Sequence, residues 1–316
     1  MDAALLIGNG LNRCHMDKQL SWEVLMQEIA GKYSVDFHGN NSFPLEFECM
    51  ANSICSKSRK TLDTVITDLK SDIAEKINSI APKSTWIHRS FISLPVREIM
   101  TTNYDYYLEN LIDKNFPEGW KLGRKAEKRE RSHSIRRRYL NDGYTVRHIH
   151  GEANTPGSIC LGYDHYVRAL AEISAYIKEI VGIEYTLSKK PMPTDGMLQR
   201  SNGSQRYYGD SWMELFFTHD IHIVGLSLDV CEIDLWWLLT YRAKLISLFK
   251  EKERINNTIY YYYTTSDSQK TPPTIDLFKR LYIECVPVVL KGKNYKAAYK
   301  DIAGIIKETI SDRKNI

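Results

Sequence analysis

The opening residues of the chain constrain its fold more than any other stretch. An apolar run from Ala3 to Ile7 ends abruptly at Gly8-Asn9-Gly10, and a helical pattern begins near Ser21. Such a run is typical of a strand buried in the middle of a parallel sheet. Two glycines one residue apart let the backbone turn tightly and approach a ligand with no Cβ atom in the way. Since Arg13 stands where a dinucleotide fingerprint has its third glycine, both a phosphate-binding turn and a plain tight turn stay open.

The rest of the chain alternates between strand-like and helix-like stretches. Apolar or β-branched runs predict five further strands, and apolar residues spaced three and four apart predict helices between them. This alternation predicts an α/β fold with a doubly wound parallel sheet. The expected strands are Val96–Thr102, Tyr144–His150, Asp220–Leu228, Thr258–Tyr263 and Cys285–Leu290, and the expected helices include Trp22–Ile29, 45–80, Tyr106–Ile112, one around Arg131–Leu140, Tyr166–Val181, 231–245, 275–283 and Tyr295–Ile310.

Composition narrows the class of protein. The chain has 316 residues, of which 43% are hydrophobic, so it can bury a sizeable core. No apolar run approaches the roughly 18 residues of a membrane span, and the first strand begins without a leader pattern, so we expect a cytoplasmic protein. None of the six cysteines forms a C-x-x-C pair. We therefore expect no zinc ribbon and no metal.

The net charge of +4 comes from one stretch. Residues 121–138 hold nine Lys or Arg and two Glu, a local charge of +7, which leaves about −3 for the rest of the chain. A solvated surface segment, a contact to an acidic partner or neighbouring subunit, and a nucleic-acid contact are the three interpretations. Sparse aromatic residues argue against stacking on single strands.

Polar residues follow four of the expected strands. Open α/β sheets bind ligands at the carboxyl ends of their strands, so we expect these groups to converge at one edge. They are Gly8-Asn9-Gly10-Leu11-Asn12, Thr101-Thr102-Asn103-Tyr104-Asp105, His150-Gly151 and Gly225-Leu226-Ser227-Leu228-Asp229.

This ordered set resembles the sirtuin (SIR2) superfamily in its divergent bacterial SIR2-like branch. The order is a glycine strand-turn, then T-x-N-x-D, then H-G, then G-x-S, over residues 3 to about 240. The resemblance implies one SIR2-like domain over 1–316 that binds NAD on a Rossmann-like core. That core would take in about 1–27, 95–165 and 215–316, with helical insertions at about 28–94 and 166–214.

The resemblance also implies roles for single residues. His150 would be the general base, Asn103 would orient a water or the nicotinamide ribose, and Asp105 would help to hold the pocket. Gly8 and Gly10 would admit the pyrophosphate, and Gly225 and Ser227 would contact the adenosine. The NAD-contacting set is completed by residues of the same motifs: Asn9, Leu11, Asn12, Thr102 and Asp229.

The sequence departs from the sirtuin deacylases in having no zinc ribbon after the histidine. Residues 152–212 contain only Cys160. The chain is therefore more similar to the SIR2-like effectors of anti-phage abortive infection, which implies hydrolysis of NAD to nicotinamide and ADP-ribose or a cyclic form. Because an uncontrolled activity of this kind would kill its host, we expect control by assembly, as a homo-oligomer or with a HerA-type ATPase.

Other interpretations stay open at this point. The same pocket would suit an NAD-dependent protein deacylase or ADP-ribosyltransferase, and a non-catalytic NAD or ADP-ribose sensor is a third class. His150 could be bonded to a backbone carbonyl, Asn103 could be a turn former and Asp105 a helix cap. We interpret His148 as structural and expect Ser227 and Asp229 to cap the helix at 231–245.

Overall fold

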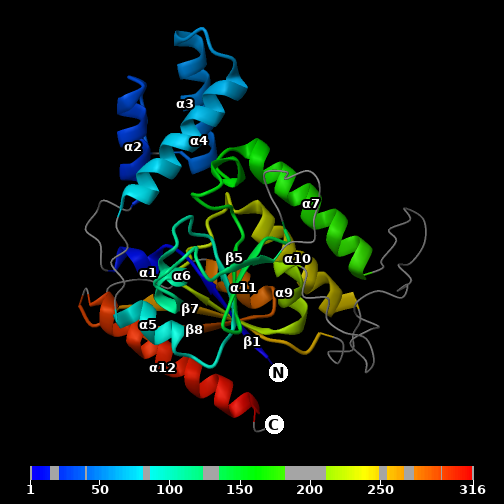
Figure 1. The fold of residues 1–316 in the computed structure, drawn as a ribbon. Helices are drawn as coiled ribbons and strands as arrows, with labels where there is room; N and C mark the ends of the chain where they lie inside the picture. The colour runs from blue at the N-terminus through cyan, green and yellow to red at the C-terminus, as the bar shows by residue number, and fades with distance from the viewer. Residues whose placement is uncertain are drawn as a thin grey trace, which may run out of the picture.

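The computed structural model describes residues 2–14, 21–39, 41–80, 86–123, 135–181, 211–248, 255–266, 274–292 and 294–314. Its centre is an eight-stranded sheet in the order β3-β4-β5-β2-β1-β6-β7-β8 (Figure 1). The six strands from β5 to β8 in this order are parallel, whereas β4 runs antiparallel to its neighbours β3 and β5. The strands are β1 (Ala3–Ile7), β2 (Glu98–Thr101), β3 (Lys121–Gly123), β4 (Arg138–Asn141), β5 (Tyr144–His148), β6 (Asp220–Val224), β7 (Ile259–Thr265) and β8 (Ile283–Val289).

The parallel strands follow the doubly wound Rossmann order. Counted along the chain they lie as 3-2-1-4-5-6, which confirms the predicted α/β class. The strand order reverses between β1 and β6, so the switch point lies at the end of the first strand. Ile7 pairs with Thr101 on one side and with Val224 on the other. The residues that follow these three strands therefore start at the same edge of the sheet.

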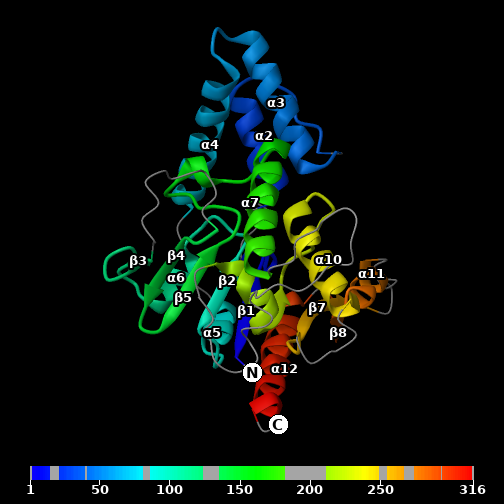
Figure 2. The same cartoon turned by 90° about the vertical axis from the view of Figure 1, so that its right-hand side faces the viewer.

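Both faces of the sheet are covered by helices, which explains why the central strand β1 is apolar throughout. Leu5 and Ile7 face a core formed with α5 (Trp86–Ile92), α6 (Tyr107–Ile112) and α12 (Tyr295–Lys314). Ala4 and Leu6 face the opposite core, formed with α7 (Tyr163–Val181), α9 (Leu215–Thr218), α10 (Ile233–Leu248) and α11 (Thr274–Arg280). Figure 2 shows α12 and α10 covering different parts of the sheet.

Three helices between β1 and β2 form a lobe, whose core also takes in residues from the edge of the sheet such as Tyr104, Ala153 and Leu161. The three helices are α2 (Trp22–Lys32), α3 (Phe43–Lys57) and α4 (Leu62–Ser79). Ser21 and Thr61 begin α2 and α4 by accepting hydrogen bonds from the amides of Val24 and Thr64. The lobe stands beyond the carboxyl edge of the sheet, and the start of β1 and the end of α12 lie at the opposite end of the molecule (Figures 1 and 2). It is therefore placed to cover the edge where the polar groups gather.

Most expected elements are confirmed, and four predictions are corrected. The helical pattern over 45–80 is two helices, because Ser58–Lys60 breaks it before the Thr61 cap. Residues 138–140 belong to β4 rather than to a helix, since they pair with β5 in a hairpin that turns at Asp142 and Gly143. The predicted helix over 275–283 ends at Arg280. The edge strands β3 and β4 make the sheet mixed rather than wholly parallel.

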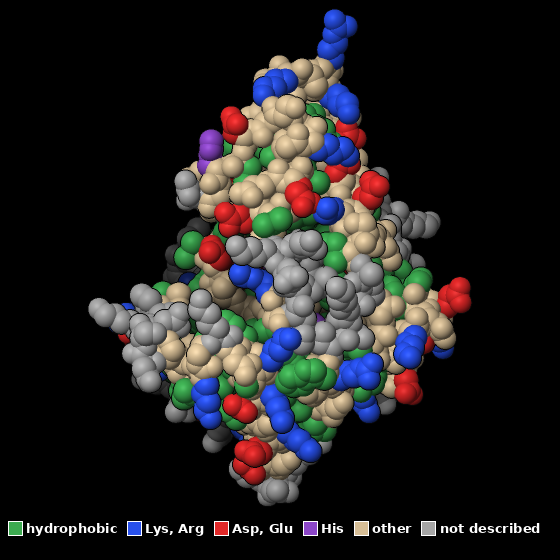
Figure 3. All heavy atoms as spheres, turned by 90° about the vertical axis from the view of Figure 1, so that its left-hand side faces the viewer, with side chains coloured by type: hydrophobic (Ala, Val, Ile, Leu, Met, Phe, Trp, Pro, Cys, Tyr) green, Lys and Arg blue, Asp and Glu red, His purple; other side chains and the backbone are tan. Residues whose placement is uncertain are grey.

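Part of the basic stretch falls outside the described residues, which omit 124–134. On the face drawn in Figure 3, Lys and Arg side chains are interspersed with Asp and Glu over both the helical lobe and the sheet body. Arg137 lies against the Glu152 carboxylate and is partly buried. At least this member of the stretch is therefore engaged within the chain. None of the helices in the described ranges is long and apolar enough to cross a membrane.

Candidate functional site

The turn after β1 packs directly against the turn after β6. The amides of Gly8 and Gly10 donate to the carbonyls of Val224 (2.9 Å) and Gly225 (2.8 Å). A Cβ added to Gly8 would lie 2.5 Å from the Gly225 carbonyl oxygen, and one added to Gly10 would lie 2.5 Å from the Tyr299 hydroxyl. Close packing of the two turns is therefore sufficient to explain both glycines, and their amides are already paired.

The backbone of Asn103, at the end of β2, is fixed from two sides. Its amide donates to Thr101 Oγ1 (3.0 Å), and the Thr101 hydroxyl donates to the carbonyl of Ile7 (2.9 Å). Its carbonyl lies 2.7 Å from His148 Nδ1. The residue is 8% exposed. Asn103 therefore has a rigid backbone at the carboxyl edge, which is what a positioning amide needs.

Asp105 joins the second strand end to the first. Its Oδ2 accepts from Asn12 Nδ2 at 2.8 Å, and its Oδ1 accepts from the amide of Tyr107 at 3.0 Å, as a cap of α6 does. Asn12 Oδ1 in turn lies 2.9 Å from His88 Nε2. Burial raises the pKa of Asp105 to about 6 despite these hydrogen bonds. Asp105 thus serves as a cap of α6 through Oδ1 and as a pocket residue through Oδ2.

These groups line a cleft between the sheet edge and the helical lobe, with a volume of about 450 Å³ including its open mouth. Its floor is polar and its opposite wall, from α2 and the end of α4, is apolar. This combination suits a ligand with both ring and hydroxyl or phosphate groups. The lining residues are Asn9, Asn12, Trp22, Leu25, Ile77, Ile80, Asn103, Tyr104, Asp105 and Tyr107.

His150 does not line this cleft and lies in a buried cluster beside it. Its Nε2 is 3.0 Å from Oδ2 of Asp234, in the first turn of α10, and the two side chains are 4% and 1% exposed. Burial disfavours the charged ring, but the Asp234 carboxylate outweighs it and raises the pKa of His150 above its usual value. Within the described part of the chain, Nδ1 makes no hydrogen bond, so this nitrogen is the one left for chemistry.

Tyr104 links the cleft to the histidine cluster. It lines the cleft, and its hydroxyl donates to the carbonyl of Cys160 (2.6 Å), whose amide donates to the carbonyl of His150 (2.9 Å). The ring of Tyr166 packs edge-on against His150, with centroids 5.7 Å apart. Tyr104 therefore contacts both the cleft and the segment that pairs with the backbone of His150.

Part of the chain around the cleft matches the model of a known family. Residues 97–194 match the family model of the SIR2-like domain, a range that starts just before β2 and takes in Asn103, Asp105 and His150. This match supports membership of the SIR2-like superfamily. SIR2-like domains use NAD as a substrate, so the cleft belongs to a protein with an NAD-related function. No curated protein matches the chain.

The loop after β6, at the third of these strand ends, makes mainly local contacts. Asp229 accepts from the amide of Cys231 through Oδ1 (3.0 Å), and its carbonyl accepts from the amide of Glu232 (3.0 Å). Ser227 is exposed. These contacts favour capping before α10, as expected for Asp229. They leave the predicted adenosine contacts of Gly225 and Ser227 as predictions.

Two acidic residues of the candidate site, Asp234 and Glu232, were not predicted from the sequence. Glu232 Oε2 is buried with no hydrogen-bond partner in the described chain, and burial raises the pKa of this carboxyl to about 7. An available signal was the order of elements: both residues lie where α10 starts, after a strand that ends at the ligand edge. Among the residues described, no group of three or more His, Cys, Asp or Glu is arranged to hold a metal ion.

Proposed function

We propose that this protein is an NAD⁺ hydrolase that cleaves the nicotinamide–ribose bond and releases nicotinamide and ADP-ribose. The observation that carries the proposal is the His150–Asp234 pair beside a polar cleft in a SIR2-like domain. Asn103 and Asp105 contribute to the floor of the same cleft. A buried acid–histidine pair is suited to activating a water molecule, and an amide side chain is suited to placing one.

The reaction requires two things of the protein, which are a group that places the attacking water and one proton acceptor. Loss of nicotinamide leaves positive charge on the ribose, as in other glycoside cleavages, and water then attacks this centre. Asn103 would orient that water without adding charge to the site. His150 would take the water proton at Nδ1, because Nε2–H is committed to Asp234. Asp234 would hold the ring in this tautomer and stabilise the imidazolium that forms.

The proposal requires the cleft to extend past Tyr104 when NAD is bound. Asn103 lines the cleft, whereas His150 is not among its lining residues. The tyrosine side chain is held by the hydrogen bond from its hydroxyl to the Cys160 carbonyl and by edge-on packing against Trp22, with ring centroids 5.0 Å apart. We expect NAD binding or assembly to break this bond and bring the histidine to the ribose.

The biological setting that we propose is abortive-infection defence in the cytoplasm. Depletion of NAD stops the growth of an infected cell, and the same activity must be silent in a healthy one. We propose that a homo-oligomer or an ATPase partner of the HerA type supplies this control.

Product analysis tests the proposal. The purified chain is incubated with NAD, alone and together with a neighbouring gene product, and the products are separated by chromatography. Nicotinamide and ADP-ribose in equal amounts are expected. Acyl-ADP-ribose formed only with an acylated peptide would assign the chain to the transferases instead. Tight NAD binding without nicotinamide release in either preparation would make the protein a sensor.

A further inference from the structure

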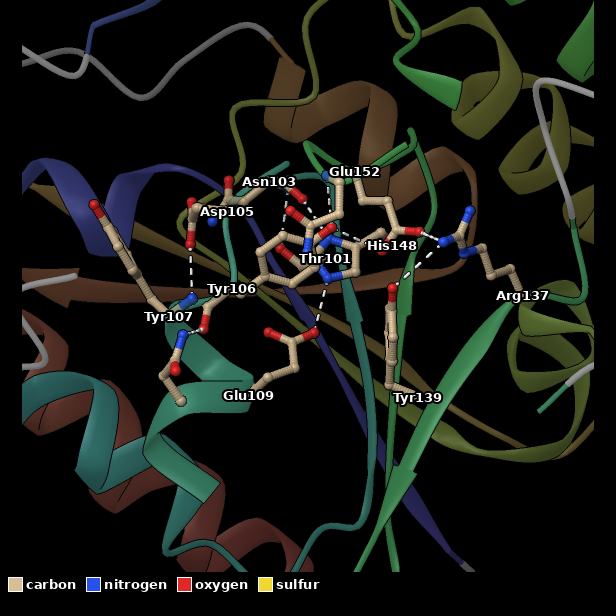
Figure 4. A network of polar contacts seen from close by, with 12 residues as sticks. Thr101, Asn103, Asp105, Tyr106, Tyr107, Glu109, Arg137, Tyr139, His148 and Glu152 are labelled. Carbon is tan, nitrogen blue, oxygen red and sulfur yellow. Dashed lines mark hydrogen bonds and ion pairs between the residues drawn. The ribbon is translucent and has the colours of Figure 1, made fainter. Parts of the chain in front are cut away.

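A buried ion pair lies directly behind Asn103, and the proposed mechanism does not use it. His148, the last residue of β5, points one ring nitrogen at the Asn103 carbonyl and the other at the carboxylate of Glu109 in α6 (Figure 4). Both distances are 2.7 Å, and the two side chains are 3% and 0% exposed. The three residues come from three elements that meet behind the carboxyl edge.

The contacts of His148 suit a charged ring. Burial disfavours the imidazolium, but the Glu109 carboxylate outweighs this effect and raises the pKa of His148 to about 9. A carbonyl and a carboxylate both accept, so a ring that donates from both nitrogens satisfies both contacts. Hydrogen bonds from a charged donor are shorter and stronger than neutral ones, which agrees with the 2.7 Å separation.

Stability alone does not account for this pair. Glu109 Oε2 is buried and has no hydrogen-bond partner within the described residues, and such an atom costs free energy. Buried ion pairs are in general no more stabilising than apolar residues of the same size. The rings of Tyr106 and Tyr139 pack edge-on against His148, with centroids 5.3 and 6.3 Å away, so the surroundings would accept an apolar side chain.

The His148–Glu109 pair thus costs free energy of folding, and its contact to the site is a hydrogen bond from His148 to the carbonyl of Asn103. We propose that the His148–Glu109 pair positions Asn103 for catalysis, by fixing its carbonyl so that the side-chain amide stands at one place in the cleft. The inference rests on the proposed function for the role of Asn103. Thr101 holds the backbone amide of the same residue, so the histidine completes a clamp on both backbone groups of Asn103.

The test uses Glu109→Gln and His148→Gln, with His222→Gln as the matched control. His222 is fully buried in β6, stacked on Tyr260 at 4.9 Å, and lies outside the site. With NAD as the probe, the two site variants are expected to lose about 10- to 100-fold in kcat with KM within twofold, because a small displacement of a catalytic group slows the chemical step. His222→Gln is expected to lose stability while kcat stays within twofold.

A second readout does not depend on activity. The side-chain amide signals of Asn103, assigned with Asn103→Asp, are followed by nuclear magnetic resonance. They are expected to shift in Glu109→Gln and to stay in place in His222→Gln. Unshifted signals, or kcat losses no larger than that of the control, would overturn the positioning role. If the wild-type chain does not cleave NAD in any assembly, the proposed function fails, and the amide signals still decide whether the pair positions Asn103.

Discussion

His150 and Asp234 are 84 residues apart in the chain, yet Nε2 of the histidine lies 3.0 Å from Oδ2 of the aspartate. The contact joins the end of β5 to the start of α10 across the carboxyl edge of the sheet. It fixes which ring nitrogen carries a proton. This relationship converts a histidine at a strand end into a candidate base with a defined orientation.

Replacing Asp234 by Asn tests that role through the pH profile. A base must be neutral, so the wild-type rate of NAD cleavage should rise with pH through a pKa above the usual histidine value of about 6.5. In Asp234→Asn the ring loses the charge that raises its pKa, and the rise should move to lower pH with a plateau about a hundredfold lower. An unchanged midpoint would show that the pair does not govern catalysis.

Replacing Gly8, which directly follows β1, by a residue with a side chain should destabilise the fold. A Cβ on Gly8 would lie 2.5 Å from the Gly225 carbonyl oxygen and 2.7 Å from Leu226 Cα, which are backbone atoms. Gly8→Ala should lower the free energy of unfolding by about 2–3 kcal/mol in urea. Gly31→Ala, in α2 with no atom within 4 Å of the new Cβ, is the control and should gain roughly 0.5–1 kcal/mol. Equal stability of the two variants would contradict the packing of the turns.

At neutral pH the ionised carboxylate of Asp105 should lower the free energy of unfolding. Its pKa is about 6 in the fold against an ordinary 3.8, so the folded state binds its proton more tightly than the unfolded state. Asp105→Asn should therefore raise the free energy of unfolding at pH 7 by about 1–2 kcal/mol, allowing for partial exposure. Asn12 and His88 can exchange donor and acceptor roles to receive the new amide. The gain should vanish below pH 4, and a gain that persists there would refute the charge as its cause.

His222 should make the fold sensitive to acid. Burial between Tyr260 and Tyr262 lowers its pKa to about 4, so the unfolded chain takes up this proton first as the pH falls below about 6.5. Stability should fall by about 3 kcal/mol between pH 7 and pH 4 through this group. In urea titrations across this range, His222→Phe should show a smaller loss. An equal loss of stability in the wild type and in His222→Phe would exclude His222 as the cause of the acid sensitivity.

The sequence predicted the fold well because the signals are local. The apolar runs at Ala3–Ile7 and Asp220–Val224 and the glycine turns after them are readable without knowing any partner. Strand boundaries and the split between α3 and α4 were less certain, since helical spacing continues through the break. The hairpin of β4 was missed because basic residues hide a short strand that depends on pairing with β5.

The site was predicted only in part, for a physical reason. Motifs named Asn103, Asp105 and His150, but contacts between distant segments decide their environment. The Asp234 partner of His150, the Glu109 partner of His148 and the Trp22 wall of the cleft come from helices whose placement no spacing rule gives. The absence of His150 from the lining of the cleft was likewise invisible in the sequence.

The central claim is that Asn103 and His150 act together on one NAD molecule. The most direct measurement is nicotinamide release from NAD by the assembled wild-type protein, Asn103→Ala and His150→Ala, each shown to be folded by its thermal transition. The account predicts release by the wild type and a loss of about a hundredfold or more in both variants. Turnover that survives either substitution in a folded protein would contradict it.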